Sequence, residues 1–112
     1  MKTKKRFKIP IFNYGLIVTV FDSNNDIIEV VNNTDGIPFR GITIASDNYS
    51  NVYIKNQDFS TASHEAYHIT NLIWKFIGYI PQRDNDEVSA YLSTYIYDLI
   101  CKVIKFHSNV FS

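Results

Sequence analysis

Two histidines four residues apart, with a glutamate directly after the first, are the residues of this chain best suited to chemistry. His64, Glu65 and His68 form the pattern H-E-x-x-H within FSTASHEAYHITNLIWKFIG. On a helix, residues four apart project from the same face, so the two imidazoles can bind one ion. Neutral imidazole is a ligand well suited to Zn²⁺. Glu65 would flank that ion, where a general base for a zinc-bound water belongs.

The helical phase of this stretch also favours a metal site. At about 100° per residue, Asn71 and Lys75 share the face of the two histidines. A pair of core histidines would lie within the apolar stripe instead, so the phase favours exposed ligands. Asn71 is therefore a candidate to hold His68 from behind the metal, or else it meets solvent. The apolar stripe on the opposite side comprises Ala62, Ala66, Ile69, Ile73, Phe76 and Ile77.

A third protein ligand is harder to assign. The extended pattern H-E-x-x-H-x-x-G-x-x-H would need Gly at position 71 and His at position 74, and the chain has Asn71 and Trp74 there. The carboxylate we favour is Glu87, which follows His68 by 19 positions (87 − 68). Asp84 and Glu87 also have the spacing of a capping box, in which Glu87 stabilises a helix N-terminus without any metal. Spacing alone leaves ligand and cap equally open.

The first half of the chain must supply strands, because it carries short apolar runs bounded by turn-forming residues. A weaker signal over residues 26–33 favours a short helix over another strand. The predicted strands cover residues 7–12, 15–21, 39–45 and 51–55, and the last two form a hairpin.

The second half of the chain changes to a helical period. Ser60 can cap a first helix that ends near Gly78, and Asp84 or Asn85 can cap a second helix that runs to about residue 106. The fold class is therefore α+β: a small antiparallel or mixed sheet followed by two long helices, in a single domain over residues 1–112. The predicted apolar stripe of the second helix comprises Val88, Leu92, Ile96, Leu99 and Val103.

Composition and charge narrow the possible partners. The chain is 46% hydrophobic with a formal net charge of +0, so we expect a folded domain without nucleic-acid or membrane partners. No run approaches the roughly 18 apolar residues of a membrane span. Residues 1–6 are basic, and we interpret them as a solvated tail rather than a phosphate-binding arm. The single cysteine, Cys101, allows no internal disulfide, which is typical of a cytoplasmic protein.

The two helical stretches together resemble a known family. TASHEAYHITNLIWKFIG, followed by NDEVSAYLSTYIYDLI, is similar to small zincin-like metallopeptidases of phages and bacterial mobile elements. These are distant relatives of the ImmA/IrrE-type and gluzincin peptidases. Their second helix opens with a Glu followed by Ala-Tyr, which corresponds here to Glu87 with Ala90 and Tyr91. The resemblance covers about residues 59–100.

The resemblance implies a minimal zincin-like fold with Zn²⁺ held by His64, His68 and Glu87. Glu65 would activate a zinc-bound water, and the reaction would be hydrolysis of a peptide bond. Tyr91 would donate to the oxyanion or support a ligand, or else it packs as an aromatic residue between the two helices.

The resemblance also implies a peptide or protein substrate beside the strand that precedes the first long helix. Val52, Tyr53 and Ile54 of that strand would pair with the extended substrate. The alternative function is a non-catalytic, zincin-like protein-binding or regulatory domain of phage or mobile-element origin, because no Asp follows Glu87 by four positions as in better-known gluzincins. In a third reading, Glu87 is only a cap and the histidines are solvated.

Overall fold

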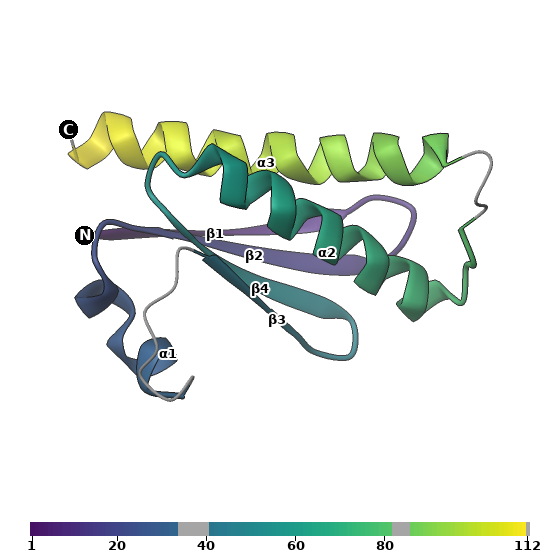
Figure 1. Ribbon diagram of the computed structural model, residues 1–112, viewed down its shortest axis with the longest axis horizontal. Coiled ribbons are helices and arrows are strands. Elements are labelled where there is room, and N and C mark those ends of the chain that lie inside the picture. Colours follow the sequence, from purple (N-terminus) through teal and green to yellow (C-terminus); the bar gives the residue numbers. More distant parts are fainter. Residues whose placement is uncertain (34–40, 82–85, 112) are drawn as a thin grey trace.

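In the computed structural model, four strands form one mixed sheet, and two long helices pack across one of its faces (Figure 1). The structure describes residues 1–33, 41–81 and 86–111. The predicted α+β class is therefore confirmed. The strands are β1 (Lys2–Ile9), β2 (Tyr14–Phe21), β3 (Gly41–Ala45) and β4 (Tyr49–Lys55), and the helices are η1 (Asn24–Ile27), α1 (Ile28–Asn33), α2 (Phe59–Ile77) and α3 (Glu87–Phe111).

The order of strands across the sheet is β1-β2-β4-β3. β1 is antiparallel to β2, and β2 is parallel to β4. β3 and β4 are antiparallel and form the predicted hairpin. β4 therefore has a hydrogen-bonded neighbour on each side, and β3 is an edge strand. The short helix predicted over residues 26–33 is present as η1 and α1. The predicted start of β3 at residue 39 lies outside the described residues.

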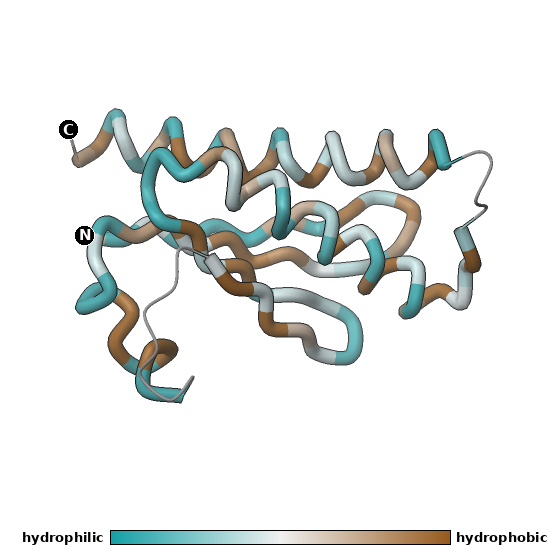
Figure 2. Tube along the Cα trace, viewed as in Figure 1, coloured by the Kyte–Doolittle hydropathy of each residue, from teal (hydrophilic) through white to brown (hydrophobic). Residues whose placement is uncertain are grey.

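Alternate side chains of the strands face the helices and form the interface between the sheet and the helical layer. In β2, Tyr14, Leu16, Val18 and Val20 are at most 1% exposed, and they face α2 and α3. Burying each such side chain contributes on the order of 1.5–3 kcal/mol. α2 packs on β3 and β4, while α3 packs on β1 and β2. Figure 2 shows hydrophobic segments alternating with polar segments along both long helices.

The prediction that residues 1–6 form a solvated basic tail is wrong, because β1 begins at Lys2. β1 pairs with β2 from Lys2 opposite Phe21 to Ile9 opposite Tyr14. Its alternate residues face the helices, and the Thr3 Oγ1 atom lies 2.8 Å from Nδ1 of the buried His107. Lysines are compatible with such a position, since they are common on edge strands. The predicted extension of this strand to residue 12 is also wrong, because the strand ends at Ile9.

The N-cap of α2 lies two residues before the predicted one, and the helix begins at Phe59. The Asp58 carboxylate accepts a hydrogen bond from the Thr61 N–H at 3.2 Å, so Asp58 rather than Ser60 caps the helix. Gly78 follows with φ of 76°, the left-handed conformation predicted for the residue after the helix. The predicted apolar stripe is buried from Ala62 to Ile73, but Phe76 and Ile77 are each 42% exposed in the last turn.

α3 runs back antiparallel to α2 and continues to Phe111, beyond the predicted end (Figure 1). Four members of its predicted stripe are buried, but Val88 is 53% exposed. The first turn directs Ser89 toward α2 instead, where its Oγ accepts a hydrogen bond from the Trp74 indole at 2.7 Å. The predicted caps, Asp84 and Asn85, lie outside the described residues. None of the helices in the described part of the chain has the length and apolarity needed to cross a membrane.

Candidate metal centre

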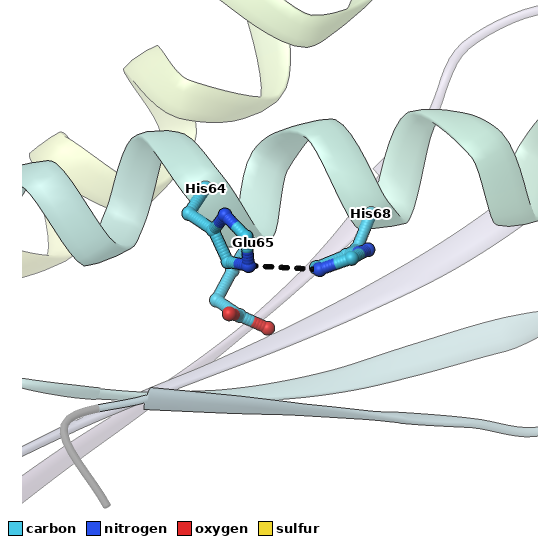
Figure 3. A group of neighbouring side chains, drawn as sticks. All are labelled: His64, Glu65 and His68. Carbon is cyan, nitrogen blue, oxygen red and sulfur yellow. Dashed lines mark hydrogen bonds between the residues drawn. The ribbon is translucent and has the colours of Figure 1, made fainter.

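His64, Glu65 and His68 lie in the first half of α2, and their side chains project toward the edge strand β3 (Figure 3). One ligand atom from each of the three lies within 4.8 Å of the others. The His64 Nε2 and His68 Nε2 atoms are 2.9 Å apart, and the two rings are nearly perpendicular at 87°. The helical spacing therefore brings both imidazole nitrogens to one point, as predicted.

The separation of the two nitrogens suits a tetrahedral cation. With Zn–N distances of 2.0–2.1 Å, two ligands at the tetrahedral angle lie about 3.3 Å apart. Opening the gap between His64 Nε2 and His68 Nε2 from 2.9 Å by about 0.4 Å would accommodate the ion. Both side chains are exposed, so small side-chain rotations suffice. Each ring would then carry its proton on Nδ1, because the metal needs both Nε2 lone pairs.

Glu65 differs from the two histidines in its burial. Its side chain is only 6% exposed, and its Oε1 atom accepts a hydrogen bond from Thr43 Oγ1 at 2.7 Å. Thr43 lies on β3, so this bond connects the edge strand to the helix that carries the histidines. Local sequence patterns do not single out Thr43, because its partner is 22 positions away and on another element. It lies within a predicted strand, and only the placement of β3 against α2 reveals its contact.

A hollow of about 540 Å³ opens beside the group, between α2 and β3. Gly41 permits the close approach of these two elements, because a Cβ atom there would lie 2.5 Å from Thr61 Cγ2. The predicted candidate Asn71 lines this hollow and is exposed, so it lies on the site's side of α2. Its hydrogen bond to His68 stays a prediction. The side chains that line the hollow belong to Ile42, Thr43, Ala45, Glu65, His68, Asn71, Leu72 and Lys75.

Glu87 does not join the histidines, so the predicted third ligand is misplaced. The hydrogen bond between Trp74 and Ser89 sets the start of α3 beside the C-terminal part of α2. Trp74 lies ten positions after His64, which is about 15 Å along a helix. Glu87 is exposed in the first turn of α3, at the end of the domain away from the histidines. Because the two helices are antiparallel, residues at the start of α3 cannot reach the first half of α2.

Tyr91 lies one turn farther along α3 and is 74% exposed. The expectation that it packs between the two helices is therefore wrong. Its assignment as an oxyanion donor, or as a residue that supports a metal ligand, stays a prediction.

The prediction that β4 pairs with the substrate is also wrong. Val52 and Ile54 of β4 are fully buried, and Val52 is paired with both Val18 and Thr43. Tyr53 points to the sheet face opposite the helices, where it contacts the small cluster beneath α1. Since both edges of β4 are already paired, an extended peptide can add only to β3 on this side of the sheet.

No family model matches the chain. No curated protein and no solved structure matches it either. The structure supports two parts of the resemblance. His64, Glu65 and His68 form a possible metal-binding group on α2, and two long helices follow the sheet along the chain.

Proposed function

We propose that this protein is a zinc-dependent peptidase whose metal is held by His64 and His68. The observation that carries the proposal is the convergence of the two Nε2 atoms at 2.9 Å, with a Glu65 oxygen in the same group. Two imidazole nitrogens suit Zn²⁺ as ligands, and the carboxylate beside them suits a base next to the ion. A bound zinc ion would supply a Lewis acid that polarises a substrate carbonyl and lowers the pKa of water.

Glu65 is the residue placed to move protons in this reaction. The Thr43 hydroxyl donates to Oε1 at 2.7 Å, which holds the carboxylate and leaves Oε2 to accept a proton from the attacking water. The same oxygen would then return the proton to the leaving amine. Because Glu65 is 6% exposed, bulk water competes little for this carboxylate. Thr43 thus acts as a positioning residue for the general base.

β3 gives the substrate a backbone to pair with. It is the edge strand on the side of α2, so one row of its N–H and C=O groups faces away from β4 and is available to an extended peptide. The hollow of about 540 Å³ between β3 and α2 would receive a substrate side chain next to the histidines. A peptide bound in this way would run past the metal-binding group with its carbonyls close to His68.

Zinc content and peptide cleavage test the proposal separately. Purified protein should bind one equivalent of Zn²⁺ by elemental mass spectrometry, and His64→Ala or His68→Ala should abolish this binding. Glu65→Gln should retain zinc and lose cleavage of an extended fluorogenic peptide library by about 100-fold or more. Glu29→Gln changes an exposed carboxylate of α1 and is the matched control, with cleavage unchanged.

Full cleavage by Glu65→Gln would refute the assigned base. Stoichiometric zinc without cleavage of any peptide by the native protein would instead favour the non-catalytic, regulatory alternative. A native protein that binds no zinc at micromolar concentrations would refute the metal centre itself.

A further inference from the structure

The sheet face opposite α2 and α3 carries a row of cations. Thr3 and Ile9 of β1 are buried toward the helices, so the residues that alternate with them point to the other face. Alternate residues of a strand are about 6.6 Å apart, which makes an evenly spaced row. The four members of this cation row, all exposed, are Lys2, Lys4, Arg6 and Lys8.

Two tyrosines lie on the same face, two strands away from the cation row. The register pairs Lys8 with Gly15 and Gly15 with Tyr49, and it pairs Lys4 with Thr19 and Thr19 with Tyr53. Adjacent strands are about 4.8 Å apart, so each tyrosine lies roughly 10 Å from a cation across the sheet. Tyr49 is 36% exposed, which leaves a ring edge and face open to a ligand.

Between the cation row and the two tyrosines lies a hollow of about 510 Å³. Gly15 contributes to its floor, where a Cβ atom would lie 3.0 Å from the Cβ of Tyr49. Arg6 and Tyr53 border the hollow on opposite sides. The absence of a side chain at Gly15 thus keeps this face low near Lys8, between a basic rim and an aromatic rim.

The charges of neighbouring elements leave the cation row largely uncompensated. Asp26 and Glu29, from η1 and α1, line a separate hollow at the Lys2 end of the face. Asp47, in the turn before β4, adds one negative charge near the other end. The positive charge is therefore strongest along the middle of β1 and toward Lys8.

We propose that this face binds single-stranded nucleic acid, with phosphates along the cation row and bases stacked on Tyr49 and Tyr53. An open sheet that combines basic and aromatic side chains recognises unpaired bases, because a base needs both a π-face to stack on and a cation for its phosphate. An acidic peptide would use the cations but not the tyrosines. A duplex keeps its bases stacked inside, so the two aromatic rings would contribute nothing. The zero net charge of the chain does not oppose binding, since the relevant charge is local.

The proposal is tested by fluorescence anisotropy with a labelled twelve-nucleotide oligothymidine and the matching oligouridine. Each phosphate contact to a single strand contributes about 0.7 to the slope of log affinity against log salt. The double variant Arg6→Gln/Lys8→Gln should therefore lower that slope by about 1.4 and weaken binding by about 25-fold at 0.1 M salt. The control Lys102→Gln/Lys105→Gln removes the same charge from exposed positions of α3 and should leave both quantities unchanged.

A second variant tests the stacking part of the proposal. Tyr49→Leu should weaken binding by at least about 5-fold, because stacking on an aromatic ring is lost while a side chain of similar width remains. Circular dichroism and the thermal midpoint should confirm that the variant is folded. His64→Ala should bind the oligonucleotide like the native protein, so the result does not depend on the peptidase proposal.

Three results would overturn this inference. The first is no binding of either oligonucleotide at 0.1 mM protein and 50 mM salt. The second is an equal loss of affinity in the α3 control. The third is unchanged binding by Tyr49→Leu together with equal competition by an oligoglutamate peptide, which would show a surface that attracts any polyanion.

Discussion

The hydrogen bond between Thr43 and Glu65 connects β3, an edge strand, to the helix that carries the two histidines, and Thr43→Val removes it without changing the shape of the side chain. The Oγ1–Oε1 distance is 2.7 Å, and the accepting carboxylate is 6% exposed. A hydrogen bond to a charged group contributes about 1.5–3 kcal/mol, and more is lost when the charge stays buried without its donor. We therefore expect the free energy of unfolding to fall by about 1.5–3 kcal/mol at pH 7.

This loss can be measured by thermal unfolding monitored by circular dichroism. With an unfolding entropy of about 2.1 cal/mol/K per residue, 112 residues convert that loss into a decrease of about 6 to 13 °C in Tm. Thr43→Ser keeps the hydroxyl and should lose much less. Peptide cleavage should fall by about tenfold in Thr43→Val, with zinc content unchanged, because the base is no longer held.

A double-mutant cycle with Glu65→Gln isolates the pair. If the hydrogen bond contributes as described, the coupling free energy between the two positions should exceed about 1 kcal/mol. Thr43→Val and Thr43→Ser with the same Tm, or a coupling free energy near zero, would refute the reasoning.

Three further predictions concern other contacts. Burial raises the pKa of Tyr14 above its usual value of 10.0, so the unfolded chain ionises first. The stability that the neutral phenol contributes is therefore present below pH 10 and lost as the pH rises above it. In chemical denaturation from pH 8 to 11, Tyr14→Phe should show a smaller alkaline loss, and at pH 7 it should be about 1–3 kcal/mol less stable because the buried Ser50 hydroxyl loses its partner. Glu87→Ala should leave zinc stoichiometry unchanged and lower stability by less than about 1 kcal/mol, as expected for a charge at a helix N-terminus. Ser89→Ala should cost about 1–3 kcal/mol and shift the emission of Trp74, the only tryptophan, because its indole N–H loses its acceptor.

The parts of the site that the sequence predicted correctly depend on one helix. His64, Glu65 and His68 are separated by a single helical turn, so their relative placement follows from the backbone geometry of α2 alone. Gly78 likewise ends the helix for a local reason, its left-handed φ of 76°. The strand predicted over residues 15–21, observed as Tyr14–Phe21, follows from β-branched side chains and apolar runs, which favour a buried strand without reference to the rest of the chain.

The parts that failed depend on distant pairings. The order of β3 and β4 in the sheet decides which strand has a free edge, and local patterns carry no information about that order. Glu87 has a suitable spacing from His68 in sequence, but a short connection between two long helices makes them antiparallel and separates the two residues. In β1 the dense lysines concealed an alternation in which Thr3 and Ile9 face the core.

α2 has one face that packs against the sheet and one that meets solvent, and the two histidines lie on the second. Its apolar side packs against the sheet, whereas His64 and His68 are exposed, so the fold does not require an ion in order to form. Substitution of an exposed residue such as His64 or His68 usually alters the free energy of unfolding by less than about 0.5 kcal/mol. We therefore expect the domain to fold without metal, so that adding Co²⁺ tests the proposed site directly: its visible absorption would report the number and type of its ligands. Over generations, the two histidines can also be lost by drift while the scaffold persists. Glu65 is the exception, because its loss removes the bond that joins α2 to the edge of the sheet.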